Sequence, residues 1–329
     1  MNKNIIIFAH SNIGDVCYDL VVVDPLRRVF PGAKISILTS SRAKNIAENY
    51  TGLDNIIVYD RARGARRLIN HARFMMSLAA MQFDLAVALK NTVMPYFLGI
   101  PRVWKIRDKG IMRHPVDRNL EFLKARGVNA HQAVFGFSTG KEEDDFCDQF
   151  LKKHNIQSGD RIAGIFPIAA WSVKNWPVQK WNELADILKN RYKIKVIGFG
   201  KSNNDPYNRI VTENISRDII WAETPTLKKA MALIGKCDVF IGPDSSLIHL
   251  ASCMGCNVIA LYGPTSPDYI YPYFHRHRII TPGIKLDCMP CYPGNNFCPC
   301  NAKYRTTVCM ENITVADVLR LIDNDLQQQ

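Results

Sequence analysis

The sequence predicts an α/β protein of two doubly wound domains, each a parallel sheet covered by helices. Short apolar runs, typical of strands buried on both faces, alternate along the chain with segments of helical length. This alternation stops at a charged stretch, residues 141–154, and then restarts. The chain of 329 residues is also about twice as long as one ordinary domain. We therefore expect a first domain at 1–155 and a second at 156–329.

The expected elements follow the same order in both halves. In the first half we expect strands at 5–9, 34–38, 56–58 and 85–89, with helices at 15–30, 42–50 and 66–81. In the second half we expect strands at 162–166, 194–198, 239–241 and 258–261, with helices at 178–190, 226–236 and 245–254. Open parallel sheets bind ligands at the carboxyl ends of their strands, so the two domains are expected to face each other across a cleft lined by the loops found there.

Composition narrows the range of partners. No apolar run approaches the roughly 20 residues needed to cross a bilayer, so we expect a soluble, cytoplasmic chain. Residues 61–126 carry 14 Lys and Arg against 4 Asp and Glu. This excess attracts phosphate groups on a nucleic acid, an anionic membrane or a phosphorylated glycolipid, unless it is only a solvated surface. No zinc-finger spacing, RNP-like strand or basic heptad helix marks a specific nucleic-acid binder.

The loop after the first expected strand contains Ser11, Asn12, Gly14 and Asp15. Gly14 permits a tight turn, and Asp15 stands at the start of the following helix. Its carboxylate either caps that helix or is the general base that removes a proton from an acceptor hydroxyl. The loop lacks both the glycine spacing of a dinucleotide fingerprint and the lysine of a P-loop.

A strand end, a polar turn and a helix start come together at Asp244, Ser245, Ser246 and His249. The backbone N–H groups, serine hydroxyls and helix dipole at such a place suit a diphosphate. The alternative is a helix cap, with His249 packed in the core. Lys174 follows the first strand of the second domain and either supplies charge to departing phosphates or is an ordinary surface lysine.

The ten cysteines fall into two groups. Five are scattered through apolar or helical segments and are expected to be reduced core thiols: Cys17, Cys147, Cys237, Cys253 and Cys256. The other five crowd near the C-terminus: Cys288, Cys291, Cys298, Cys300 and Cys309. Cys-x-x-Cys is a good half-site for structural zinc, although a reduced thiol-rich loop is the alternative because Cys-x-Cys is tighter than usual zinc spacing.

Taken together and in order, these motifs resemble glycosyltransferase family 9, the bacterial heptosyltransferases. The resemblance covers nearly the whole chain. The residues that carry it are Gly14-Asp15, Arg27-Arg28-Val29-Phe30-Pro31, Phe83-Asp84-Leu85-Ala86-Val87, Gly99-Ile100-Pro101-Arg102, Lys174-x-Trp176-Pro177 with Trp181, Asp244-Ser245-Ser246-x-x-His249, and Leu261-Tyr262-Gly263-Pro264-Thr265-Ser266-Pro267.

The resemblance implies a GT-B fold of two Rossmann-like domains, the first holding the acceptor and the second the nucleotide-sugar donor. It implies inverting transfer of a heptose or related sugar from an ADP-sugar to a lipopolysaccharide core or other surface glycan, a phosphorylated glycolipid or oligosaccharide, with no cofactor and no catalytic metal. Asp15 becomes the base, with Ser11, Asn12 and Gly14 in the acceptor loop. The donor-binding residues become Lys174, Thr226, Asp244, Ser245, Ser246 and His249. The basic first domain then suits a peripheral position on an anionic membrane surface, the inner face of the inner membrane.

The chain departs from the family at Ser246, where glycine is usual, and at Ala169 and Ala170, where hydroxyl residues are usual. These departures bear on which donor sugar is used. They also leave a different class of function open: a non-catalytic nucleotide-binding protein, or a zinc- or nucleic-acid-binding protein, on the same fold.

Overall fold

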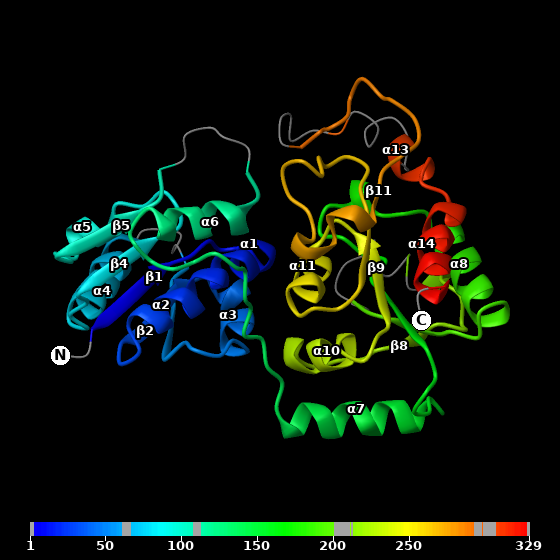
Figure 1. Cartoon of the computed structure of the whole chain (residues 1–329), viewed down its shortest axis with the longest axis horizontal. Coiled ribbons are helices and arrows are strands. Elements are labelled where there is room, and N and C mark those ends of the chain that lie inside the picture. Colours follow the sequence, from blue (N-terminus) through cyan, green and yellow to red (C-terminus); the bar gives the residue numbers. More distant parts are fainter. Residues whose placement is uncertain are drawn as a thin grey trace. The chain divides into compact units, whose positions relative to one another are not determined.

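The chain separates into two compact units, unit 1 (Met1–Ser138) and unit 2 (Thr139–Gln329) (Figure 1). The computed structural model describes residues 3–60, 67–107, 113–200, 211, 213–292, 298 and 307–327. The expected boundary at residue 155 falls inside unit 2, because the charged stretch before it forms helix α7 (Lys141–Lys153) of that unit. The acidic first turn of α7 pairs with lysines of another unit 2 helix: Glu143 Oε2 lies 3.3 Å from Lys228 Nζ.

Unit 1 is a parallel sheet with the strand order β3-β2-β1-β4-β5. The strands are β1 (Asn4–Phe8), β2 (Lys34–Thr39), β3 (Asn55–Val58), β4 (Leu85–Ala88) and β5 (Arg102–Lys105). The helices are α1 (Ile13–Asp19), the 3-10 turn η1 (Leu20–Val22), α2 (Val23–Val29), α3 (Ser41–Glu48), α4 (Arg67–Ala79), α5 (Met94–Phe97) and α6 (Pro115–Lys124). Chain order reverses between β1 and β4, so the carboxyl ends of these two strands are where a ligand is expected.

The single helix expected at 15–30 is wrong, because the structure breaks it into α1, η1 and α2. Pro25, in the first turn of α2, explains the break. Its nitrogen carries no hydrogen for a bond to the carbonyl of Val21, and its ring clashes with that carbonyl in a continuous helix. The other expected strands and helices of unit 1 are confirmed, while α5, β5 and α6 are additional.

Unit 2 has the strand order β11-β10-β9-β6-β7-β8, again parallel. The strands are β6 (Ile162–Ile165), β7 (Lys195–Gly198), β8 (Ile220–Trp221), β9 (Val239–Pro243), β10 (Val258–Leu261) and β11 (Ile279–Ile280). Besides α7, the helical segments are η2 (Ser172–Lys174), α8 (Val178–Asn190), α10 (Leu227–Ile234), α11 (Ser246–Cys253), η3 (Tyr273–Arg278), α13 (Val308–Glu311) and α14 (Val315–Gln327). Here the order reverses between β6 and β9. In the described parts of the chain, none of the helices combines the length and the apolar character that crossing a membrane requires.

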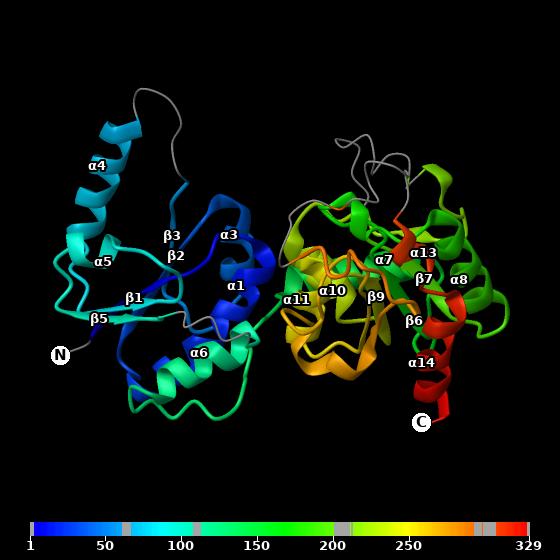
Figure 2. The same ribbon diagram turned by 90° about the horizontal axis from the view of Figure 1, so that it is seen from above.

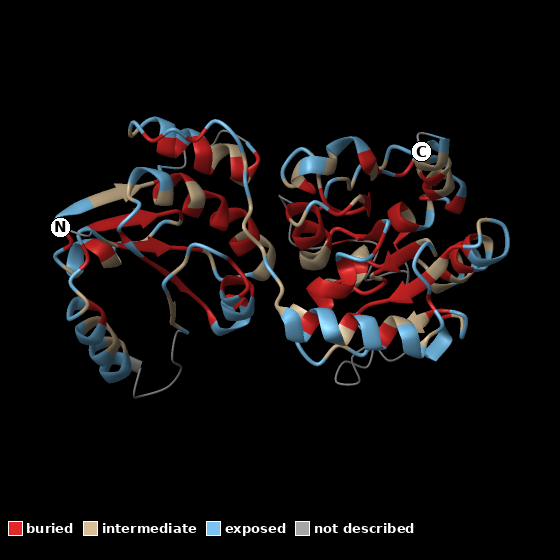
Figure 3. Ribbon diagram, turned by 60° about the horizontal axis from the view of Figure 1, so that its bottom comes forward, coloured by how far each residue is buried: buried red, intermediate tan, exposed pale blue. Residues whose placement is uncertain are grey.

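Both faces of the unit 2 sheet are buried, as an apolar run in a parallel strand predicts. Ile241 of β9 packs in one core cluster with Trp181 of α8, whereas its neighbour Phe240 packs in the opposite cluster with Leu233 of α10. Figure 3 shows the buried strands and the exposed outer face of α7. The five scattered cysteines are buried and free, as expected.

Arg278 fastens α14 to the sheet through a nearly buried ion pair. Its Nη1 and Nη2 lie 2.6 and 2.7 Å from the two carboxylate oxygens of Asp325, and its side chain is 8% exposed. Arg278→Ala is expected to lower the free energy of unfolding of unit 2 by about 3 kcal/mol, because it leaves the partly buried Asp325 carboxylate without its charged partner. Arg276→Ala is the matched control, since the Arg276–Asp268 pair is mostly exposed and such pairs contribute little. Denaturant unfolding measures both, and equal effects would contradict the assignment.

Candidate functional site

The centre of the unit 2 site is a buried carboxylate at the strand-order reversal. Asp244 follows β9, and Lys174 ends η2 in the loop after β6. Asp244 Oδ2 accepts a hydrogen bond from Lys174 Nζ at 2.6 Å. Its Oδ1 lies 2.8 Å from His249 Nε2 and accepts from the Tyr262 hydroxyl at 3.3 Å. Residues from two loops, α11 and the end of β10 therefore converge on one side chain.

These contacts keep Asp244 ionised. Burial alone would raise the pKa of Asp244, but the hydrogen bond and charge of His249, together with Lys174, hold that pKa well below its usual range. Burial and the neighbouring Asp244 raise the pKa of Tyr262 well above its ordinary value. Tyr262 is thus a neutral donor beside a fixed negative charge.

Lys174 is held in place and is not an ordinary surface lysine. Its side chain is 18% exposed, and its backbone N–H donates to the carbonyl of Trp171 at 3.0 Å. The next residue, Asn175, accepts a hydrogen bond from the backbone N–H of Ala169 at 2.6 Å and so folds the loop back on itself. Trp176 and Trp181 are buried in the core, with their rings in edge contact.

A serine and a helix start directly follow Asp244 in the chain. Ser245 is the N-cap residue of α11, but its side chain makes no capping hydrogen bond. Among the described residues, the buried Ser245 Oγ has no hydrogen-bond partner, and neither has Oγ1 of Thr265 in the loop after β10. A buried hydroxyl without a partner is costly. The Ser245 hydroxyl, with the N-terminus of α11, suits an anionic ligand.

The remaining donor-site candidates take distinct positions. His249 is 4% exposed, so it is a core histidine that also binds Asp244. Ser246 begins α11 and is half-buried. Thr226 lies after β8, at the far side of β6 from β9, and caps α10 by accepting from the Lys229 backbone N–H at 3.2 Å.

In unit 1 the expected acceptor loop follows β1 at the other strand-order reversal. Asn12 is the N-cap residue of α1, and Asp15 lies in the first turn with its Oδ2 accepting from Asn12 Nδ2 at 3.0 Å. Ser11 is exposed, and its carbonyl accepts from Ser40 Oγ at 2.6 Å. Gly14 is half-buried within α1. Asp15 is therefore a half-exposed carboxylate in the first turn of α1, and it is not the N-cap.

A histidine–aspartate pair beside Asp15 was missed by the sequence analysis. Asp19, 1% exposed, accepts from the backbone N–H of His10 at 2.7 Å and lies 2.8 Å from His10 Nδ1. Buried Asn119 of α6 donates to the other Asp19 oxygen at 3.3 Å. The available signal was Asp19 itself. It is an acidic residue among the otherwise uncharged and buried positions from Val16 to Leu20.

Because His10 pairs with Asp19, the pKa of His10 reports on the structure of this loop. Burial lowers the pKa of His10, but the charges of Asp19 and Asp15 and the Asp19 hydrogen bond raise it above 6.5 overall, against the opposing charge of Arg118. The pair therefore stabilises the fold fully below pH about 6.5, and this contribution is lost as the pH rises through the folded-state pKa. In Asp19→Asn the NMR titration midpoint of His10 is expected to fall. An unchanged midpoint would rule out the pairing.

Unit 1 also carries a basic hollow of about 620 Å³ at the carboxyl end of β5 and along α6. Five cationic side chains line it: Lys105, Arg107, Arg113, Arg118 and Arg126. Its acidic residue, Glu121, forms an ion pair with Arg113. Arg118 Nε is buried and has no hydrogen-bond partner among the described residues. This hollow suits a phosphate-bearing ligand.

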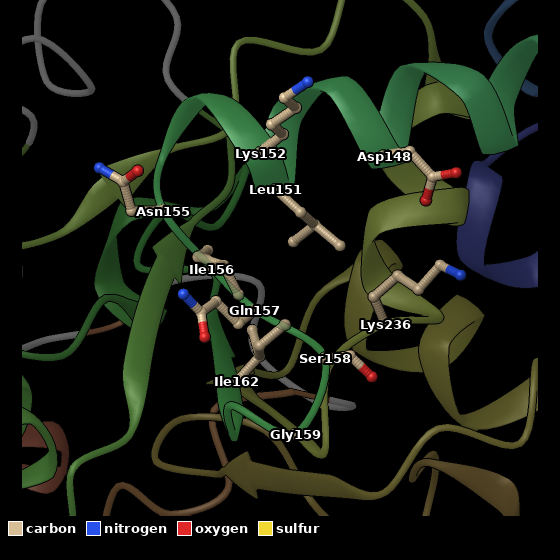
Figure 4. A pocket seen from close by; sticks show the side chains of 10 residues that line it. All are labelled: Asp148, Leu151, Lys152, Asn155, Ile156, Gln157, Ser158, Gly159, Ile162 and Lys236. Carbon is tan, nitrogen blue, oxygen red and sulfur yellow. The ribbon is translucent and has the colours of Figure 1, made fainter.

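Another hollow of about 620 Å³ lies away from this chemistry (Figure 4). It is formed by the end of α7, the loop before β6 and Lys236. Ile162, at the amino end of β6, borders it. Because ligands of parallel sheets sit at the opposite strand ends, we assign it no part in the site.

The C-terminal cysteines form a thiol cluster. Burial and the nearby Cys298 raise the pKa of Cys291 to about 12, so this thiol stays protonated. Cys291 and Cys298 both pack against Val173. Cys288 and Cys309 also lie near Cys291. In the described part of the chain, no three Cys, His, Asp or Glu side chains are placed to hold a metal ion. Cys300 lies outside the described residues, and structural zinc stays a prediction.

Comparison with known proteins decides the family. Residues 98–299, more than half of the chain, match the sequence profile of glycosyltransferase family 9 (heptosyltransferase). The chain belongs to glycosyltransferase family 9. Lipopolysaccharide heptosyltransferase 2 of Escherichia coli is 24% identical to this family 9 enzyme over 309 residues, 84% of this chain and 87% of the relative.

Solved structures show the same fold. A family 9 glycosyltransferase from Veillonella parvula has a TM-score of 0.81 at 18% identity, covering 100% of this chain and 99% of that one. The E. coli heptosyltransferase WaaC with ADP-2-deoxy-2-fluoro heptose has a TM-score of 0.69 at 16% identity, covering 98% and 100%. This family 9 glycosyltransferase has the GT-B fold, as the motifs implied.

Proposed function

We propose that this glycosyltransferase moves a heptose from an ADP-heptose donor to a phosphorylated lipopolysaccharide-core acceptor. The names of its relatives support the sugar and the glycan, and the ADP-sugar in the WaaC structure supports the donor. On this proposal unit 2 holds the donor and unit 1 holds the acceptor. The observation that carries it is the Lys174–Asp244 pair at the strand-order reversal of unit 2.

The donor diphosphate binds where positive charge and unpartnered donors are found together. Lys174 Nζ, the N-terminus of α11 and the Ser245 hydroxyl supply charge and hydrogen bonds to the phosphate oxygens. Asp244 holds Lys174 and His249 in position. Ser246 and Thr226, at the starts of the helices that follow β9 and β8, extend the binding surface along the carboxyl ends of the strands. On this proposal the step uses no metal ion, and Lys174 and the N-terminus of α11 stabilise the charge on the diphosphate.

The acceptor binds in unit 1, with its phosphates in the basic hollow. The unpartnered Arg118 Nε and the cations around it match phosphate oxygens in charge and hydrogen bonding. Ser11, Asn12 and Gly14 shape the loop that presents Asp15. A phosphorylated, lipid-linked acceptor also accounts for a peripheral position of the enzyme on the inner face of the inner membrane.

The reaction is a single displacement with inversion. Asp15 takes the proton of the acceptor hydroxyl as its oxygen bonds to the anomeric carbon of the donor. The bond between that carbon and the diphosphate oxygen breaks, and ADP leaves with the electron pair. Lys174 and the N-terminus of α11 stabilise the negative charge that develops on the departing diphosphate.

Calorimetric titration of the purified protein with ADP, UDP and GDP tests the donor assignment. Selective binding of ADP, unchanged by a chelator, is the expected result. Preference for UDP or GDP would leave the fold in place and refute the ADP-sugar. No binding of any nucleotide would refute the donor site itself.

A further inference from the structure

Helix α5 exposes an apolar surface that its own packing cannot cover. Val93, Tyr96 and Phe97 are 57%, 59% and 78% exposed. The same helix buries Pro95, and Met94 and Leu98 pack against the core cluster of the sheet. Because those inward residues fix the helix, its outward side chains cannot fold back. The set of Val93, Tyr96 and Phe97 is called the α5 surface below.

The α5 surface adjoins strong positive charge. Tyr96 belongs both to this surface and to the lining of the basic hollow, alongside Lys105, Arg107 and Arg126. Arg102, exposed at the start of β5, adds a further cation. Figure 2 shows α5 next to β5. An apolar wedge bordered by cations is the pattern of a contact with an anionic bilayer, since apolar side chains enter the interface while Lys and Arg meet the headgroups.

The size of the surface argues against a protein as its occupant. A stable protein–protein interface takes roughly 20 to 30 residues on each side, whereas the apolar part here is a few side chains on one short helix. We propose that the α5 surface docks this enzyme on the anionic surface of a phospholipid bilayer. This rests on the proposed function, in which the acceptor is lipid-linked. Docking through α5 places the neighbouring hollow at the level of the acceptor's phosphates.

Vesicle sedimentation tests the docking surface directly. The full chain is expected to bind vesicles of equal parts phosphatidylcholine and phosphatidylglycerol, and to bind phosphatidylcholine alone far more weakly. Phe97→Ser is expected to weaken binding to the anionic vesicles about tenfold, because one aromatic side chain no longer leaves water. Leu68→Ser on α4 is the matched control, since Leu68 is 79% exposed, and its binding should stay unchanged. Arg107→Ser should weaken binding about fivefold and only to the anionic vesicles.

Several results would overturn the docking proposal. Unchanged binding in both Phe97→Ser and Tyr96→Ser would do so, as would an equal loss in Leu68→Ser. Absent vesicle binding, with a self-association that Phe97→Ser abolishes in ultracentrifugation, would assign the α5 surface to a second copy of the chain. Calorimetry with ADP separates this test from the proposed function. Phe97→Ser should bind ADP as the wild type does, whereas a wild type that binds vesicles but no nucleotide counts against the donor site alone.

Discussion

Replacing Asp15 with Ala is expected to lower kcat by a factor of about 10² to 10⁴ while leaving ADP affinity nearly unchanged. Asp15 lies half-exposed in the first turn of α1, with Asn12 orienting its carboxylate. A general base acts on the acceptor hydroxyl as the bond forms, so its loss affects the transition state and not the bound donor. Steady-state kinetics and calorimetry measure the two quantities.

The control for Asp15 is Asp24→Ala. Asp24 is also an acidic residue in the first turn of a unit 1 helix, but it pairs on the surface with Arg28. Its removal should leave kcat unchanged. If Asp15→Ala weakened ADP binding as much as turnover, or if Asp24→Ala were equally inactive, the base would have been assigned to the wrong residue.

Lys174→Ala is expected to weaken ADP binding by about 1.5 to 3 kcal/mol, roughly 10- to 150-fold, the contribution of a hydrogen bond to a charged group. The diphosphate loses a cation and instead meets the charge of the buried Asp244, which Lys174 no longer neutralises. Lys174→Gln keeps a donor without the charge and should lie between the wild type and Lys174→Ala. Calorimetric titration gives the affinities.

A surface lysine provides the comparison for Lys174. Lys189 pairs with Asp218 at 2.6 Å, with both side chains about half exposed, and Lys189→Ala should bind ADP as the wild type does. Thermal melts of all the variants separate a lost contact from a lost fold. Unchanged ADP affinity in a folded Lys174→Ala would remove Lys174 from the donor site.

The sequence predicted the central strands of both sheets well, but of the edge strands it predicted only β3. Strands such as β1 and β9 are buried on both faces and appear as apolar runs. Strand β5 contains Arg102 and Lys105 and is partly exposed at the edge of its sheet, so it resembles a loop in the sequence. Strands β8 and β11 are only two residues long, and such short edge strands leave little pattern to detect.

The same contrast holds for the site. The family resemblance grouped Lys174, Asp244 and His249 in one donor site, and the structure brings their side chains into contact. Their roles in binding remain proposals. The His10–Asp19 pair escaped notice because it depends on a helix turning back onto the end of β1, and no spacing rule predicts such a contact. The hydrogen bond from the Tyr262 hydroxyl to Asp244 was also not predicted, because it depends on how the end of β10 packs beside Asp244.

The measurement that tests the account most directly is sugar transfer by the purified protein from ADP-heptose to a phosphorylated lipopolysaccharide-core acceptor. Product and released ADP are quantified in the same reaction. We expect one ADP for each acceptor glycosylated, release that depends on the acceptor, and loss of both in Asp15→Ala. A protein that binds ADP and acceptor yet forms no glycosylated product, or that releases ADP without regard to the acceptor, would contradict the proposed transfer.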